Sequence, residues 1–176
     1  MKNKIIIYTL IILFFYEFSL AEKYKFDVSN INVTDKGNTI IANEGKIISQ
    51  NKDLEIVAEK FKYNKNLDLL EANNGIAKLK IDGYELKFEK ILINNKNLLL
   101  TASGDIQVKD KKNLLNIKGE SVVLDQKNNI LTVSDGIQVQ DKKNLLNIKG
   151  ESVVLDKKNN ILTVSDGIQV QDKKNY

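Results

Sequence analysis

The sequence of 176 residues contains no cysteine, histidine, tryptophan or proline. Without cysteine and histidine, the chain lacks the usual ligands of zinc, copper and haem sites, the thiol nucleophile and the base of a Ser-His-Asp triad. No disulfide can form, so stability must come from backbone pairing and apolar burial. We therefore expect no metal, no cofactor and no enzyme activity.

The charge of the chain is mixed, because 27 lysines and arginines stand against 23 acidic residues, for a net charge of +4. Nucleic-acid binding requires a concentrated basic face with aromatic platforms. This composition does not supply one, so we expect no nucleic-acid partner. Hydrophobic residues make up 42% of the chain, which is enough for a folded core.

The first 21 residues have the three-part layout of a secretory signal peptide. Met1–Lys4 is a basic start, Ile5–Tyr16 is an apolar run, and Ser19–Ala21 supplies the small residues of a cleavage site. The alternative is an uncleaved membrane anchor. The apolar run is shorter than the ~20 residues that span a bilayer, and Glu17 stands where such a span would continue. We predict a cleaved signal peptide over residues 1–21.

The C-terminal half contains a near-verbatim duplication. The segment Ile106–Gly136 recurs as Ile137–Gly167, with differences only at Gln140 and Lys157. A third copy begins at Ile168 and stops within the unit. Repeat arrays normally close with an atypical cap, so we expect that the chain is truncated.

Diverged copies of the same unit extend upstream, so the chain after the signal peptide repeats one motif of about 30 residues. Small insertions shift the spacing, yet equivalent apolar positions still form columns. We predict one β-repeat domain over residues 22–176, with diverged units in 22–105 and near-identical units in 106–176. One apolar column contains Ile40, Leu70, Leu100 and Leu131.

Within each unit, apolar and polar residues alternate with a period of two, which is the pattern of a β-strand. Val122–Leu124 and Leu131–Val133 are examples, and Asp125–Asn129, Asp141–Asn144 and Asp135–Gly136 resemble turns. We predict strands throughout. Glycines recur near one point of the unit, where a bulge or bend requires positive φ. They are Gly45, Gly75, Gly104 and Gly136.

Polar residues form columns of their own. We expect the glutamates to be a solvated surface, because like charges one strand apart repel unless lysines lie between them. The Lys-Lys-Asn segments at 111–113, 142–144 and 173–175 are expected to be solvated turns; the alternative is that they meet anionic head groups. The glutamate column contains Glu59, Glu89, Glu120 and Glu151.

The order of these motifs resembles the OstA-like family, which comprises periplasmic lipopolysaccharide-transport proteins and the N-terminal domain of the outer-membrane lipopolysaccharide-assembly protein. After the signal peptide come Phe26–Val28, a glycine-containing step at Ile40–Ile47, the segment Leu54–Asn64, and the same step again at Leu70–Leu79. The likeness covers residues 26–110. The near-identical C-terminal copies depart from the family pattern.

The resemblance implies an all-β fold, an antiparallel V-shaped β-jellyroll (β-taco) whose two sheets are closed along one side. It implies location in the periplasm, or association with the outer membrane, and joining to other OstA-like jellyrolls by edge-to-edge strand addition. It also implies that the inner face holds the acyl chains of lipopolysaccharide. The residues expected to line this groove are Ile40, Ile56, Phe61, Tyr63, Leu70, Leu79, Phe88, Ile91, Ile93, Leu100, Ile106, Val108, Ile117, Val122 and Leu124.

Three functions are compatible with the repeat. The leading hypothesis is a periplasmic lipopolysaccharide-binding scaffold, either a soluble bridge protein or a truncated N-terminal domain of the assembly protein. The second is a structural or adhesive β-solenoid with a closed core, which predicts parallel rungs and no lipid-accessible groove. The third is an enzyme on a β-helix. It is disfavoured because the acids lie in regular columns rather than in one cluster.

Overall fold

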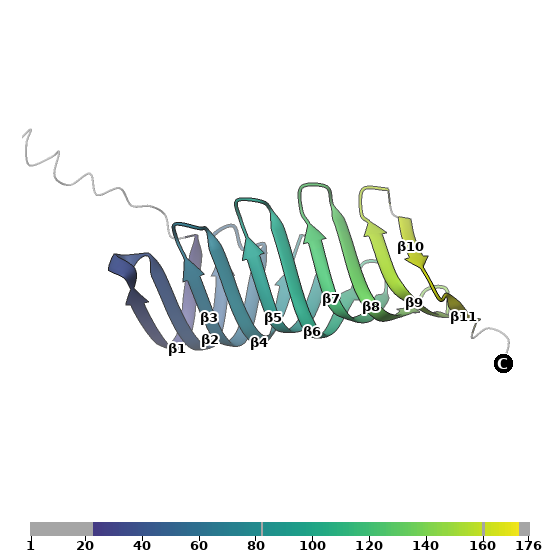
Figure 1. The fold of residues 1–176 in the computed structure, drawn as a ribbon, viewed down its shortest axis with the longest axis horizontal. Helices are drawn as coiled ribbons and strands as arrows, with labels where there is room; N and C mark the ends of the chain where they lie inside the picture. The colour runs from purple at the N-terminus through teal and green to yellow at the C-terminus, as the bar shows by residue number, and fades with distance from the viewer. Residues whose placement is uncertain (1–22, 82, 160, 173–176) are drawn as a thin grey trace, which may run out of the picture.

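The structure is a computed structural model that describes residues 23–81, 83–159 and 161–172. The predicted signal peptide, residues 1–21, lies outside the described residues. Within these residues, eleven strands join in a single sheet that is folded into a long trough (Figure 1). The elements are β1 (Tyr24–Thr34), the 3-10 helix η1 (Asp35–Gly37), β2 (Thr39–Ser49), β3 (Leu54–Asn64), β4 (Leu69–Leu79), β5 (Tyr84–Asn94), β6 (Leu99–Asp110), β7 (Leu115–Asp125), β8 (Ile130–Asp141), β9 (Leu146–Asp156), β10 (Ile161–Ser165) and β11 (Gln169–Asp172).

The sheet is an antiparallel meander in which each strand pairs with the next one in the sequence, from β1 to β10. β11 pairs with β9, as β10 does, so the two short strands share one edge of β9. The all-β prediction is confirmed. The parallel rungs of the solenoid alternative are wrong, because every strand pair in the described chain is antiparallel. The near-identical copies, from Ile106 on, continue the same meander from the second half of β6 to β10, and the start of the third copy forms β11.

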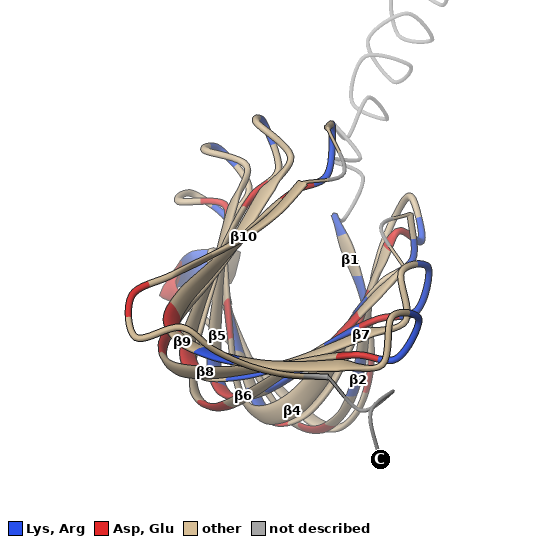
Figure 2. Ribbon diagram, turned by 90° about the vertical axis from the view of Figure 1, so that its right-hand side faces the viewer, with Lys and Arg blue, Asp and Glu red and all other residues tan. Residues whose placement is uncertain are grey.

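Each long strand bends near its middle, so the one sheet forms both arms of the trough (Figure 2). The resemblance implied two sheets closed along one side; the arms are instead the two halves of every long strand. This geometry has a local cause. The ladder between β6 and β7 shifts register between Ser103 and Ile106, and the ladder between β8 and β9 shifts between Ser134 and Ile137. Such irregularities bend a strand.

The glycines expected at this point mark the bend. Gly45, Gly104 and Gly136 have positive φ, but at the fourth position Asn74 takes the positive φ (51°) in place of Gly75. Gly75 is needed for a different reason, since a Cβ there would collide with the carbonyl oxygen of Val57. The Asp135–Gly136 segment is accordingly a bend inside β8 and not a reversal of the chain.

The bend also changes which residues face inward. In β3, Ile56 and Ala58 are buried before it, whereas Phe61 and Tyr63 are buried after it. A straight strand keeps one parity along its whole length. The change from even to odd numbers therefore keeps apolar side chains inside both arms.

The turns between strands are built by aspartates, as predicted for Asp125–Asn129 and Asp141–Asn144. Asp141 accepts the backbone N–H of Asn144 at 2.9 Å and its side-chain amide at 2.7 Å. Equivalent bonds form at the turns of the other near-identical copies. Side chains that bond their own backbone in this way favour tight turns. The segment 173–175 lies outside the described residues.

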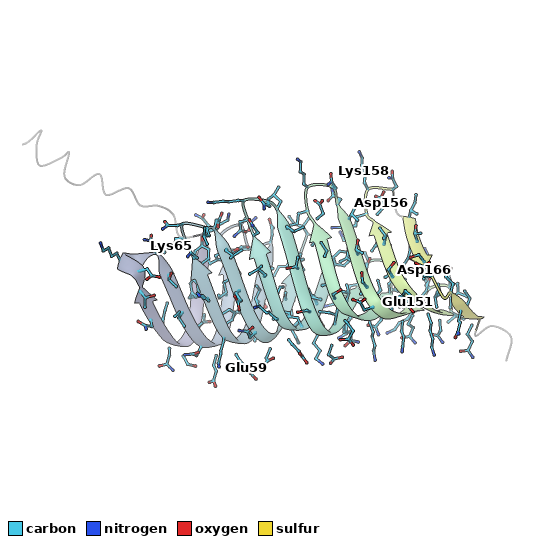
Figure 3. All side chains as sticks on the ribbon, viewed as in Figure 1. Glu59, Lys65, Glu151, Asp156, Lys158 and Asp166 are labelled. Carbon is cyan, nitrogen blue, oxygen red and sulfur yellow. The ribbon has the colours of Figure 1, made fainter. Side chains whose placement is uncertain are left out.

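The predicted glutamate column lies on the outside of the bend, where the side chains are exposed. Glu59 and Glu151 point away from the trough, and Lys65 and Lys158 lie at the turns (Figure 3). Asn74 donates a hydrogen bond to Glu59 at 2.8 Å. This part of the surface is solvated, as the sequence predicted.

Candidate functional site

The apolar interior of the trough is the first candidate site. It is one continuous cluster of buried side chains that extends from Tyr24 in β1 to Leu155 in β9. All of the residues expected to line a groove lie in this cluster, and none is more than 6% exposed. The arms therefore pack against each other through their own side chains. A lipid-binding groove and a closed core would be lined by the same residues. The two alternatives differ in whether the arms separate to admit a ligand.

Those residues come from both arms and from successive strands. Ile40 lies in β2; Ile56, Phe61 and Tyr63 lie in β3; Leu70 and Leu79 lie in β4. Phe88, Ile91 and Ile93 lie in β5; Leu100, Ile106 and Val108 lie in β6; Ile117, Val122 and Leu124 lie in β7.

The interior reaches the surface at both ends of the trough. At the N-terminal end, a cavity of about 620 Å³ is lined by Phe26, Ile31 and Val33 together with several lysines. Ile31 and Val33 are 55% and 53% exposed, because no strand of the described residues lies beyond β1. At the other end, a cavity of about 190 Å³ is lined by Ile148, Leu162 and neighbouring residues. The packed apolar interior thus extends along the described sheet from one of these cavities to the other.

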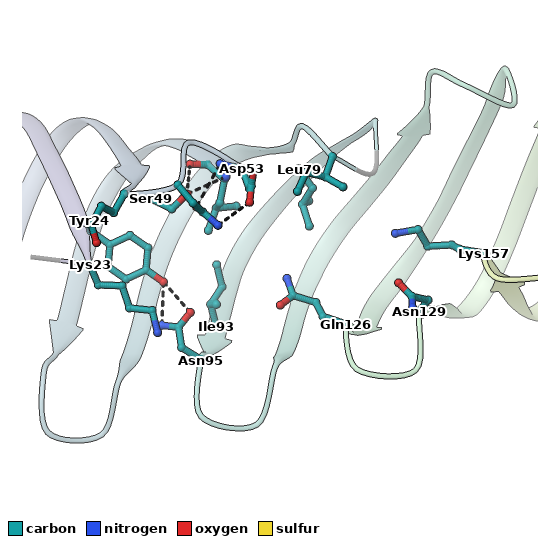
Figure 4. A pocket seen from close by; sticks show the side chains of 14 residues that line it. Lys23, Tyr24, Ser49, Asp53, Leu79, Ile93, Asn95, Gln126, Asn129 and Lys157 are labelled. Atoms are coloured by element: carbon teal, nitrogen blue, oxygen red, sulfur yellow. Dashed lines mark hydrogen bonds between the residues drawn. The ribbon is translucent and has the colours of Figure 1, made fainter. Parts of the chain in front are cut away.

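The long side of the trough opposite the bend is its mouth, between two rims. The first rim contains the start of β1 and the turns that follow β2, β4, β6 and β8. The second rim contains the turns that follow β1, β3, β5, β7 and β9. A cavity of about 520 Å³ lies between them, with an apolar floor of Leu54, Leu79 and Ile93 (Figure 4). We call it the mouth cavity.

Two residues of the first rim reach across the mouth to the second rim. The Tyr24 hydroxyl and the Asn95 side chain are hydrogen bonded, at 3.0 Å to Oδ1 and 2.8 Å to Nδ2 (Figure 4). The Lys23 ammonium forms an ion pair with Asp68 at 2.7 Å. The two pairs are themselves connected, because Asn95 donates to Asp68 at 2.9 Å. We call these four residues the latch.

The latch is anchored on an aromatic contact. The rings of Tyr24 and Tyr63 meet edge to face, with centroids 5.0 Å apart, and the Tyr63 hydroxyl donates to Asp68 at 3.1 Å. Burial of Tyr24 is the main cause that raises its pKa to about 12. Burial, and then the charge of Asp68, raises the pKa of Tyr63. Both tyrosines are therefore neutral hydrogen-bond partners at neutral pH.

Asp68 is the charged centre of the latch. Its partial burial opposes ionisation, but hydrogen bonds from Lys23, Tyr63 and Asn95 outweigh this and hold its pKa below the ordinary value. The carboxylate is thus ionised at neutral pH and accepts from three side chains. Charge-assisted bonds of this kind are stronger than neutral ones.

A second contact crosses the mouth further along. The Lys157 ammonium, in the turn after β9, lies 5.0 Å from the centroid of the Tyr84 ring at the start of β5. Tyr24 starts β1 and meets the turn after β5, so both contacts join a strand to the turn four strands later. The sheet is coiled, so the start of a strand on the first rim lies opposite the turn that follows the fourth strand after it on the second rim. Lys23, Tyr24, Asn95 and Lys157 all line the mouth cavity.

The sequence pattern did not predict the latch. One signal was present, because Tyr24 and Tyr84 occupy the first position of β1 and β5, where Leu54, Leu115 and Leu146 stand in β3, β7 and β9. A tyrosine in a leucine column indicates a polar partner for its hydroxyl. The identity of that partner depends on how the sheet coils.

The described residues hold no group of three or more acidic side chains placed to bind a metal ion. Within the same residues, no helix has the length and apolarity needed to cross a membrane.

No model of a known protein family matches the sequence, and no curated protein matches it. Among solved structures, the chain is similar to LptH from Pseudomonas aeruginosa, described as the LptA homologous periplasmic component of the conserved lipopolysaccharide transport device. The TM-score is 0.61 at 13% sequence identity, and the match covers 68% of this chain and 94% of LptH. The chain therefore has an unclosed antiparallel β-jellyroll fold of the LptA type.

Proposed function

We propose that this chain is a periplasmic scaffold that binds lipopolysaccharide and carries it toward the outer membrane, with the acyl chains held between the arms. The observation that carries the proposal is the apolar interior, which is continuous along the sheet and reaches the surface at both ends. The similarity of the fold to LptH, a periplasmic component of lipopolysaccharide transport, supports it. No step of this function requires catalysis.

The interior is suited to a ligand that slides. Burial of each acyl methylene contributes about 0.8 kcal/mol. The successive strands offer nearly equivalent apolar positions, such as Leu70, Leu100 and Leu131, so no single position traps a chain. Separation of the arms exposes side chains that now pack together, and the burial of acyl chains offsets this cost.

The free edges of the sheet supply a route to partners. Among the described residues, β1 has no neighbour on one side, and its own residues Ile31 and Val33 are exposed. An edge strand presents unpaired N–H and C=O groups, and a further strand can add to it. We propose that other jellyrolls of the same kind join here, edge to edge, so that their interiors form one path.

A second candidate is a structural scaffold whose interior never opens. The near-complete burial of Ile91, Ile117 and their neighbours favours it, because a closed core needs no ligand. An antiparallel sheet with a closed core is compatible with this role, whereas the observed strand pairing excludes a parallel solenoid.

Site-specific photocrosslinking separates the two candidates. A photoreactive residue is placed at Phe61, Phe88 or Leu100, and the protein is incubated with purified lipopolysaccharide and irradiated. We expect lipid adducts from each position. The matched controls are the adjacent residues Lys62, Lys87 and Thr101. Equal adducts at inner and control positions, or none at the inner ones, would reject the transport function.

A further inference from the structure

The mouth cavity lies between the two contacts that cross the mouth. The latch stands at one end of it, and the Lys157–Tyr84 contact stands at the other. Its floor is apolar, and its frame is polar, with Gln126 and Asn129 from the second rim (Figure 4). An amphiphile fits this arrangement, because its acyl chains match the floor and its polar head matches the frame.

The interior below this floor is full. Leu79 is 6% exposed and Ile93 is 4% exposed, and both pack within the central cluster. An acyl chain that passes the floor must therefore push the arms apart. The arms are covalently joined through the bend. Near β1, the hydrogen bonds and the ion pair of the latch hold the two rims together. Separation of the two rims at this end therefore breaks the latch.

The latch is well placed to act as a gate. On the first-rim side, Lys23 is held by the sheet, because its carbonyl oxygen accepts the backbone N–H of Gln50 at 2.9 Å. On the second-rim side, Asn95 and Asp68 lie in turns and not in strands. The contacts across the mouth are made by side chains, so they can open without loss of the β-sheet ladder.

We propose that the mouth cavity is the lateral access site of the interior for an acyl-chain amphiphile with a polar head, and that the latch must open to admit it. This inference rests on the proposed function. The second cross-mouth contact marks the far limit of the site. Amphiphiles thus have a side route into the trough, in addition to its two ends.

A crosslink across the latch tests the proposal. The natural chain has no cysteine, so Lys23→Cys and Asp68→Cys introduce the only two thiols. In the natural chain the contact is made by the tips of the Lys23 and Asp68 side chains, so the two shorter cysteines are too far apart for a disulfide. A short bis-maleimide therefore joins them. The control is Lys62→Cys with Glu71→Cys, which face each other on adjacent strands of one arm. The measurement is the rate at which each protein captures fluorescently labelled lipopolysaccharide.

We expect the crosslinked latch to capture at least tenfold more slowly than the same variant without crosslinker. That uncrosslinked variant has lost the Lys23–Asp68 ion pair, so it should capture at least as fast as the natural chain. The crosslinked control should capture at the rate of the natural chain. The complementary variant Tyr24→Phe keeps the ring and removes the hydroxyl. Loss of its hydrogen bonds should speed capture by up to about tenfold.

The outcomes separate the two proposals. Undiminished capture by the crosslinked latch would overturn the gate and leave the proposed function standing. Equal loss of capture in the crosslinked control would also overturn the gate, because a link within one arm does not close the mouth. Absence of capture by the natural chain would overturn both.

Discussion

The hydroxyl of Tyr24 lies 3.0 Å from Oδ1 of Asn95, a residue 71 positions later in the sequence. This contact is one of those that span the mouth of the trough, whose arms are covalently joined through the bend. It shows that the two rims meet near β1, where the interior also comes to the surface. The contact connects the fold to its proposed use, because in the proposal above it must break before a ligand enters the interior from the side.

The Tyr24 hydroxyl should make a measurable contribution to stability. Tyr24→Phe preserves the edge-to-face contact with Tyr63 but removes the bonds to Asn95. We expect a loss of about 1 kcal/mol in the free energy of unfolding, as for a typical hydrogen bond. Urea denaturation followed by circular dichroism measures it. An unchanged midpoint would mean that the latch is open in solution.

Asp68 should make stability depend on acid pH. Its pKa is lowered in the folded chain, so the folded state binds fewer protons than the unfolded state around this pKa. The stabilisation is therefore present above the unfolded pKa and is lost as the pH falls through the folded pKa. In urea titrations between pH 7 and pH 2, Asp68→Asn should be less stable at neutral pH, and its difference from the natural chain should shrink in acid. A difference that stays constant with pH would contradict this assignment.

Gly75 should be intolerant of a side chain. A Cβ at this position meets the Val57 carbonyl oxygen and the Ala58 side chain. We expect Gly75→Ala to destabilise by more than about 2 kcal/mol, since the obstacle includes backbone of the adjacent strand. Gly136→Ala is the matched control, because it has open space around its Cβ and only the cost of φ +62°, about 1 kcal/mol. Thermal unfolding of both variants compares them, and equal losses would show that the close approach at Gly75 relaxes freely.

The interior should behave as a packed core in the absence of ligand. Ile91 is fully buried, and we expect Ile91→Ala to cost about 2–5 kcal/mol. Ile76, on the neighbouring strand, is 42% exposed, and Ile76→Ala should cost about 0.5 kcal/mol or less. Chemical denaturation measures both. Similar small losses at the two positions would indicate an interior that is already open.

The exposed residues of β1 should control self-assembly if edges join. We expect the natural chain to form larger species as its concentration rises, and Ile31→Lys to suppress them by placing a charge beside the free edge. Val57→Lys is the control, because Val57 is 47% exposed but lies in β3, within the sheet. Light scattering coupled to size-exclusion chromatography reports the mass. Equal masses for the natural chain and Ile31→Lys at all concentrations would argue against assembly through β1.

The sequence by itself determined the local features of this protein. Period-two alternation identified the strands and selected inward residues such as Phe61, Leu100 and Val122, all of which lie in the interior. This succeeds because side-chain direction along a strand is a local property of the backbone. Asx turns such as Asp141–Asn144 were predictable for the same reason, since their hydrogen bonds connect residues three positions apart.

Tertiary structure decided what depends on the path of the whole sheet. Alternation did not show that the segments Leu115–Ile117 and Val122–Leu124 belong to one bent strand, or that neighbouring strands run antiparallel. The pairing of Tyr24 with Asn95 was equally inaccessible, because it depends on the accumulated bend and coil of five strands rather than on any spacing in the sequence. The sequence determined which residues face inward, and the curvature of the sheet determined which rims meet and where the interior can open.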